Sequence, residues 1–182
     1  MLGEIGAFSL HLFGRTFYPV QVAEKGVCWV RATYVGEPGH GSMPWPDTAP
    51  NRLVRALNRL LEAERPTRVL PEVQEFFTRV SGLMSAENAA GYDDLETSLR
   101  DPEFRARFLS NRQYSAMVRA TFAVTMLRGS EKSNVIPPEA SAQIDCRMLA
   151  GDDPQEIAAW VRGVVADEHV EVRIAREPKI PN

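Results

Sequence analysis

The stretch "SAQIDCRML" (Ser141–Leu149) alternates polar and apolar residues from Ser141 to Met148. Successive side chains of a β-strand point to opposite faces of the sheet, so this alternation predicts a strand with one face on a core and the other face open. The core face would carry Ala142, Ile144, Cys146 and Met148, and the open face Ser141, Gln143, Asp145 and Arg147.

The segments that follow this strand predict a helix and a further strand. The sequence "DDPQEIAAWVRGVVAD" (152–167) begins with Asp153 as a cap, Pro154 in the first turn and Glu156 at the third position, close to a capping box. The sequence "HVEVRIA" (169–175) alternates again. The apolar residues of these two elements are Ile157, Trp160, Val161, Val164 and Val165 on the helix, and Val170, Val172 and Ile174 on the strand.

The segments that precede it predict two strands and a helix. The sequences "VCWVRATYV" (27–35) and "TFAVTMLRG" (121–129) are rich in β-branched and aromatic residues, which favour strands. Residues 47–64 show the period of an amphipathic helix, with Asp47 or Thr48 as its cap. Its apolar face would carry Leu53, Val54, Leu57, Leu60 and Leu61.

A helical insertion, residues 66–120, separates the two halves of this pattern. Residues 71–84 and 101–120 are predicted to be helices, the second starting at Asp101. Without the insertion the order is β-α-β-β-α-β, which predicts an α+β fold: a ferredoxin-like sandwich with a four-stranded antiparallel sheet and two helices on one face. The fold alone fixes no function.

Composition and charge exclude several classes of protein. The 182 residues suit one ordinary domain, or one small domain with an insertion, and 44% hydrophobic residues are enough for a packed core. The net charge of −3 and the lack of an apolar run of about 20 residues oppose nucleic-acid and membrane partners. No signal peptide is evident, and Cys28 and Cys146 lie in predicted strands, as expected of reduced core thiols in a cytoplasmic protein. Both ends of the sequence look truncated, so we expect this chain to be a piece of a longer protein.

The chain lacks the motifs of a self-sufficient catalytic site. Its three histidines are His11, His40 and His169, and there is no H-x-D, H-E-x-x-H, C-x-x-C or Glu-Glu motif. Since a zinc site needs three or four clustered His, Cys or carboxylate ligands, we expect no metal site in this chain. The chain alone is expected to be inactive.

The strongest candidate for a functional residue is His40, in "GEPGHGSMPWP" (36–46). Gly39 and Gly41 allow backbone angles that are closed to other residues, and Ser42 can form a local hydrogen bond. Such a loop can project the ring, whose N–H is a good donor to a developing oxyanion. The alternative, which the spacing of these residues alone favours, is a histidine in a Gly/Pro turn that has no functional role.

A second candidate pair lies in "KSNVIPPEASAQIDCR" (132–147). Asn134 precedes two prolines that stiffen the chain, and Arg147 is on the open face of its strand. Together they could hold a substrate carboxylate, because arginine binds carboxylates bidentately. The alternative is a turn asparagine and a solvated arginine paired with Asp145.

Two of these segments together carry a family resemblance. "EKGVCWVRATYVGEPGHGSMP" (24–44) and "SNVIPPEASAQIDCRMLAGDDPQEI" (133–157) resemble the lid, or dimerisation, domain of the zinc aminoacylase, carboxypeptidase and succinyl-diaminopimelate desuccinylase family, metallopeptidase family twenty. The insertion is similar to that of its carboxypeptidase S and N-acyl amino acid hydrolase branch. Residues 1–14 resemble the end of the catalytic domain.

The resemblance implies boundaries and roles. Residues 1–23 would be a catalytic-domain remnant and linker, residues 24–175 the lid with its insertion at about 66–120, and residues 176–182 the start of the return linker. In the whole enzyme, a water on one or two zinc ions, activated by a glutamate, would attack an amide of a peptide or N-acyl amino acid. The lid would form a homodimer and send a histidine into the other subunit's active site. On this pattern that histidine is His40, and Asn134 and Arg147 contact substrate.

Two other functions use the same fold. A free-standing regulatory module that binds a small molecule would need no projecting histidine. An RNA-recognition module is opposed by the acidic balance and by the lack of an aromatic K/R-G-F motif.

Overall fold

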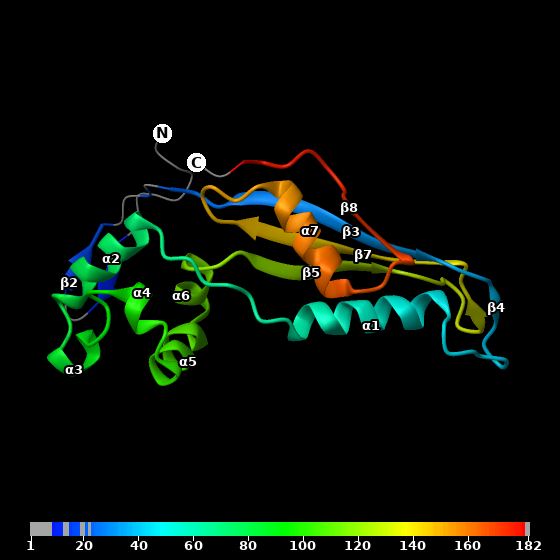
Figure 1. Cartoon of the computed structure of the whole chain (residues 1–182), viewed down its shortest axis with the longest axis horizontal. Helices are drawn as coiled ribbons and strands as arrows, with labels where there is room; N and C mark the ends of the chain where they lie inside the picture. The colour runs from blue at the N-terminus through cyan, green and yellow to red at the C-terminus, as the bar shows by residue number, and fades with distance from the viewer. Residues whose placement is uncertain (1–8, 13–14, 19–20, 22, 181–182) are drawn as a thin grey trace. The chain divides into compact units, whose positions relative to one another are not determined.

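The structure, a computed structural model, describes residues 9–12, 15–18, 21 and 23–180. The chain forms two compact units, each described here by itself (Figure 1). The sheet unit contains Gly26–Arg65 and the chain from Thr121 onward. The helical unit contains Pro66–Ala120 and the N-terminal segment up to Lys25.

The sheet unit has the predicted ferredoxin-like fold. Its strands are antiparallel and lie in the order β5-β7-β3-β8, and the chain runs β-α-β-β-α-β through them. Both helices contact β3, β7 and β8 from the same side of the sheet (Figure 1). The elements are β3 (Gly26–Val35), α1 (Ala49–Glu62), β5 (Thr121–Arg128), β7 (Glu139–Met148), α7 (Pro154–Val165) and β8 (Val170–Ile174).

The core of this unit follows the predicted alternation. The apolar face of β7 is buried and Arg147 on its other face is exposed, but Ser141, which was predicted on the open face, is buried as well. Asp153 caps α7 as expected, since its side chain accepts a hydrogen bond from the backbone N–H of Gln155. On the same helix, the ring of Trp160 stacks on Phe122 of β5 with 4.6 Å between ring centroids.

The predicted apolar face of α1 was partly wrong. Leu53, Leu57 and Leu60 are buried, but Val54 and Leu61 are 64% and 60% exposed. Each of these two lies one residue, or about 100°, beyond a buried leucine, which turns it out of the contact with the sheet. The capping prediction is resolved in favour of Thr48, whose side chain accepts from the N–H of Asn51.

The β3–β7 ladder continues into a small ribbon at one end of the sheet. After the pair Val35–Glu139, the N–H of Gly36 donates to the carbonyl of Pro138 (2.7 Å). Pairing resumes in β4 (Gly39–His40) and β6 (Val135–Ile136), where His40 lies opposite Val135. Pro38, Pro137 and Pro138 fill the junction, and because proline has no N–H the ladder is interrupted there.

The helical unit contains several short helices rather than the two predicted. The predicted helix 101–120 breaks at Asn111, which ends α5 and caps α6 by accepting from the N–H groups of Gln113 and Tyr114. A hairpin of β1 (Leu10–Leu12) and β2 (Arg15–Phe17) also belongs here, while residues 1–8, 13 and 14 of the expected catalytic-domain remnant lie outside the described residues. The helices are α2 (Pro71–Ser81), α3 (Ala86–Ala89), α4 (Leu95–Ser98), α5 (Pro102–Ser110) and α6 (Arg112–Met117).

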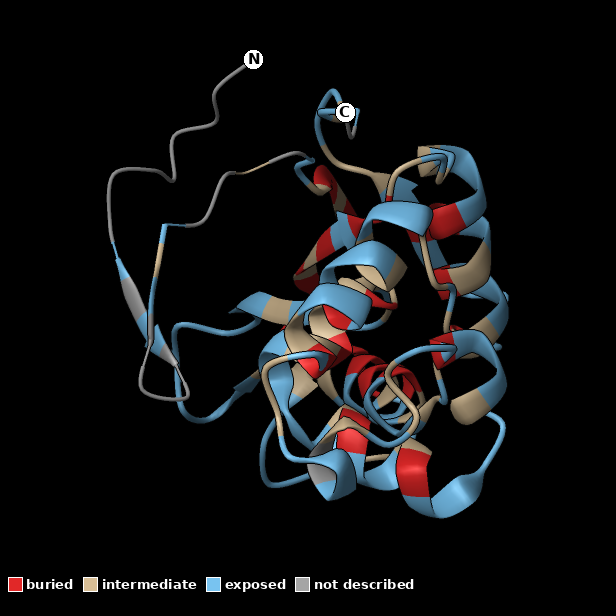
Figure 2. Ribbon diagram, turned by 90° about the vertical axis from the view of Figure 1, so that its left-hand side faces the viewer, coloured by how far each residue is buried: buried red, intermediate tan, exposed pale blue. Residues whose placement is uncertain are grey.

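An aromatic cluster forms the core of the helical unit. The Phe77 ring is fully buried, and its centroid lies 4.9 Å from Tyr114, 5.1 Å from Phe108 and 5.4 Å from Tyr92. Figure 2 shows the buried segments on the inner sides of these helices. Gly91 touches this cluster with a left-handed backbone (φ +89°), and a Cβ there would lie 2.6 Å from Cε2 of Phe104.

We expect Gly91→Ala to destabilise the helical unit by about 3 kcal/mol, from the left-handed backbone and the overpacked ring together. All three tryptophans, Trp29, Trp45 and Trp160, belong to the sheet unit. Urea unfolding should therefore show an earlier loss of far-UV circular dichroism at an unchanged midpoint of tryptophan fluorescence. An unchanged dichroism transition would contradict the packing described here.

Gly151→Ala is the matched control. Gly151 also has a positive φ (+82°), but no atom lies within 4 Å of a Cβ built there. Its substitution should cost only the backbone term of about 1 kcal/mol, and it should move the tryptophan transition instead.

The two cysteines should be unreactive in the folded chain. Cys28 and Cys146 lie opposite each other on β3 and β7 and are fully buried as free thiols, and burial raises the pKa of both. Since the thiolate is the reactive form, a thiol reagent should modify neither cysteine until urea unfolds the sheet unit. Rapid labelling of the native chain would contradict this prediction.

Candidate functional site

His40 and Asn134 meet at the outer end of the β4–β6 ribbon. The side-chain nitrogen Nδ2 of Asn134 lies 3.5 Å from Nε2 of His40, and both residues are exposed. Their backbones are also joined, because the N–H of Gly41 donates to the carbonyl of Asn134 (2.8 Å). Two residues that are 94 positions apart in the sequence therefore present their polar groups side by side.

The glycines beside His40 act differently from the prediction. Neither Gly39 nor Gly41 has a positive φ, so neither uses the backbone angles closed to other residues. Gly39 instead makes room for a ring, since a Cβ there would lie 2.6 Å from Cζ3 of Trp45. At Gly41 a Cβ would lie 3.4 Å from the carbonyl oxygen of Asn134, an ordinary van der Waals contact, so the packing does not require glycine there.

Ser42 contacts the other ring nitrogen of His40. Its hydroxyl oxygen lies 2.8 Å from Nδ1, and its backbone N–H donates to the same nitrogen over 3.2 Å. A turn follows, in which the N–H of Met43 donates to the carbonyl of His40 (3.0 Å). The ring is thus held at Nδ1 while its Nε2 edge is directed to the Asn134 side.

Arg147 is far from this pair and already has a partner. Its Nε and Nη2 donate to the two carboxylate oxygens of Asp145 over 2.8 and 3.2 Å. Arg147 also lies eight residues beyond Glu139 along β7, about 27 Å at the rise of an extended strand. The structure therefore does not bring Arg147 together with Asn134 within one chain.

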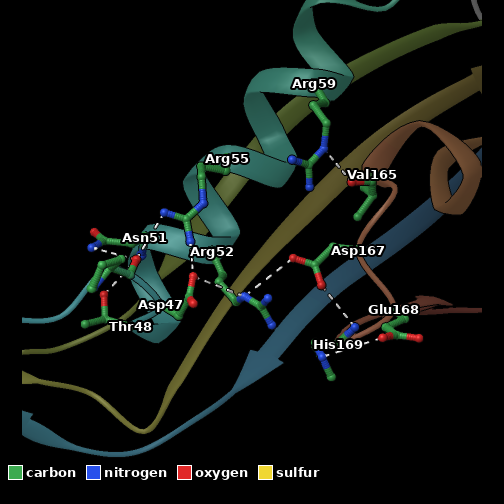
Figure 3. A network of polar contacts seen from close by, with 11 residues as sticks. Asp47, Thr48, Asn51, Arg52, Arg55, Arg59, Val165, Asp167, Glu168 and His169 are labelled. Carbon is green, nitrogen blue, oxygen red and sulfur yellow. Dashed lines mark hydrogen bonds and ion pairs between the residues drawn. The ribbon is translucent and has the colours of Figure 1, made fainter.

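A polar hollow of about 580 Å³ lies between α1 and the turn after α7 (Figure 3). Arg52, Arg55 and Arg59 line it from neighbouring turns of α1. Asp47 lies 2.7 Å from the Arg55 guanidinium and 3.6 Å from that of Arg52, which is also 3.7 Å from Asp167.

Arg59 completes this network by donating from Nε to the carbonyl of Val165, the last residue of α7 (2.6 Å). A cation is favourable beside the partial negative charge of a helix C-terminus. The charges of the hollow are thus used to join α1 to the end of α7, and we assign it a structural role.

The residues that the structure describes offer no evident metal site. Among the described residues there is no group of three or more His, Cys, Asp or Glu side chains that could hold an ion. At the outer end of the β4–β6 ribbon, called the tip below, the imidazole of His40 and the amide of Asn134 can both donate to a negatively charged oxygen.

None of the helices that the structure describes is long and apolar enough to cross a membrane.

Sequence reasoning missed the role of Trp45 and the pairing of His40 with Asn134. The only sequence signal for the first was an aromatic residue close to a glycine, which is too common to be informative. The pairing depends on the register of β4 and β6, across a junction with one more residue on the first strand (36–38) than on the second (137–138).

Comparisons with known proteins agree with this fold. The Sulfolobus solfataricus M20 family metallo-carboxypeptidase Sso-CP2 has a similar structure, with a TM-score of 0.51 at 14% identity over 86% of this chain and 39% of that one. That likeness shows a shared fold.

Two curated relatives match over most of this chain. A probable carboxypeptidase S-like 2 of Dictyostelium discoideum is 29% identical over 84% of it, and the N-fatty-acyl-amino acid synthase/hydrolase PM20D1 of Xenopus tropicalis is 31% identical over 85%. The chain spans only 29% and 30% of the length of these two proteins.

A family model described as the peptidase dimerisation domain matches residues 22–173, which run from before β3 to the next-to-last residue of β8 and include the tip. This match favours a domain of an enzyme over a free-standing regulatory module. The chain belongs to the family of M20 peptidase dimerisation domains.

Proposed function

We propose that this chain is the lid of a zinc-dependent amidohydrolase that cleaves an amide bond of a peptide or an N-acyl amino acid. Its contribution is a pair of hydrogen-bond donors, His40 and Asn134, for the negatively charged oxygen that develops on the attacked carbonyl. The observation that carries the proposal is the 3.5 Å approach of His40 Nε2 and Asn134 Nδ2 at an exposed tip. Donors that are fixed before the reaction stabilise such charge without reorganisation.

The hydrolytic step belongs to residues outside this chain. The described residues do not fit a zinc ion, because they contain no cluster of ligands for one. The family match and the metallo-carboxypeptidase neighbour support a metal in the whole enzyme. We therefore propose that the zinc ligands and the general base lie in a catalytic domain.

The lid is proposed to form a homodimer through an edge of its sheet. The outer strand β5 has no neighbour beyond it among the described residues, and Met126 and Leu127 on this strand are 41% and 66% exposed. An unpaired edge is a template for a second copy of the same strand. We propose that this two-fold pair brings the tip of each subunit to the active site of its partner.

Arg147 is proposed to bind the substrate's carboxylate. The substrate would replace Asp145, whose carboxylate now accepts both hydrogen bonds from the Arg147 guanidinium. Because Arg147 and His40 lie at opposite ends of the β7 ladder, one chain cannot offer both to the same small substrate. We propose that each active site takes Arg147 from one subunit and the His40–Asn134 pair from the other.

Replacing His40 in the full-length enzyme tests the oxyanion role. We expect His40→Ala to lower kcat by about 10²- to 10³-fold, the usual loss for one oxyanion donor, with KM nearly unchanged. Steady-state kinetics on an N-acyl amino acid would measure both. His169→Ala, which removes another exposed imidazole of the sheet unit, should leave kcat as in the parent, and equal kcat values for His40→Ala and parent would exclude the role.

Mixing two inactive variants tests the division between subunits. In a hybrid of His40→Ala and Arg147→Ala subunits, one of the two sites would have both residues intact. After dissociation and reassociation in equal amounts, half of the dimers are hybrids, so about a quarter of the parent's activity should return. Sedimentation equilibrium would verify the dimer. No recovery in a mixture that has exchanged subunits would place both residues in the same subunit's site.

A further inference from the structure

We propose that Ser42 is a positioning residue that holds His40 as the Nε2–H tautomer, with its N–H directed to the Asn134 side. The use of this tautomer rests on the proposed function, but the tautomer itself is a property of this chain alone. The argument depends on three contacts within the loop and on the direction in which each hydrogen bond must run.

The first contact favours one of the two neutral tautomers. The backbone N–H of Ser42 is directed at Nδ1 of His40 over 3.2 Å, and a backbone amide can only donate. Nδ1 must then present its lone pair. In a neutral imidazole one nitrogen is the acceptor and the other carries the proton, so the proton lies on Nε2.

The second contact reinforces the same choice. The Ser42 hydroxyl lies 2.8 Å from Nδ1, and a hydroxyl can rotate to donate or to accept. A proton on Nδ1 would suit the hydroxyl but would oppose the amide N–H. In the Nε2–H tautomer both groups of Ser42 can donate to Nδ1 and share its one lone pair, and at 2.8 Å the hydroxyl is the nearer of the two.

The third contact, between His40 and Asn134, relates the tautomer to the proposed oxyanion role. With Nε2 protonated, the N–H of His40 and the amide of Asn134 face the same space 3.5 Å apart. When Asn134 presents its NH₂ group, two donors converge there, as a negatively charged oxygen requires. Rotation of the amide by 180° would instead let its oxygen accept the His40 proton, which would keep the pair satisfied before substrate arrives.

The loop around these contacts is held on both sides. The N–H of Gly41 is bound to the carbonyl of Asn134 (2.8 Å), and the N–H of Met43 is bound to the carbonyl of His40 (3.0 Å). Ser42 lies between these two anchors. These two backbone bonds hold the turn that places the amide of Ser42 on Nδ1.

The test uses ¹⁵N NMR of the ring nitrogens in this chain at alkaline pH, where imidazoles are neutral. The ¹⁵N shifts of His40 should show an unprotonated, hydrogen-bonded Nδ1 and a protonated Nε2. In Ser42→Ala, which loses the hydroxyl but keeps the backbone N–H, they should move part of the way toward the shifts of the urea-unfolded chain, and in Ser42→Thr they should remain as in the parent, because threonine keeps the hydroxyl. A protonated Nδ1 in the parent, or shifts unchanged in Ser42→Ala, would overturn the proposal.

Kinetics of the full-length enzyme separate this inference from the function on which it rests. Ser42→Ala should lower kcat by roughly 10- to 100-fold with little change in KM, as expected when a catalytic group loses its orientation, and Ser42→Thr should recover it. If His40→Ala retains the parent's kcat, the oxyanion role fails while the NMR result stands. If His40→Ala loses kcat but Ser42→Ala does not, the positioning role fails alone.

Discussion

The pairing of β3 with β7 is the constraint on which the rest of the sheet unit depends. It runs without a break from Gly26–Met148 to Val35–Glu139, in the middle of the four-stranded sheet. One face of this ladder provides the buried side chains under α1 and α7, and its continuation brings β4 beside β6. The same register therefore determines both the core and the meeting of His40 with Asn134.

Much of this fold could be predicted from sequence because its patterns are local. The alternation in β7 and β8 and the cap at Asp153 depend only on neighbouring residues, and the structure has all three. The predictions were wrong where contacts between residues far apart in the sequence determine the structure. The outer position of Val54 on α1 depends on which side of the helix meets the sheet, and the break at Asn111 replaces a continuous helix with two that pack around Phe77.

In the candidate site, too, some features could be predicted from local sequence and others depend on tertiary contacts. The glycine-framed loop identified His40, but the reason for Gly39 is the ring of Trp45, a tertiary contact that spacing cannot reveal. Asn134 was grouped with Arg147 because both lie in one motif, whereas the ladder places Asn134 beside His40 instead. The pair of Arg147 with Asp145 is a short-range consequence of strand geometry, since residues two apart share a face, and it was the alternative considered from sequence.

The ribbon that carries His40 is built from two strands, so the face on which its last side chain lies depends on whether the number of residues in each strand is odd or even. Adding one residue to each strand would advance the tip by about 3.4 Å and also turn the next side chain to the opposite face. Adding two residues to each strand would extend the reach by about 7 Å and restore the original face. Lids of this construction can therefore differ in reach only by even steps if the imidazole is to face the same side, with the proline junction as the natural place for a compensating bulge.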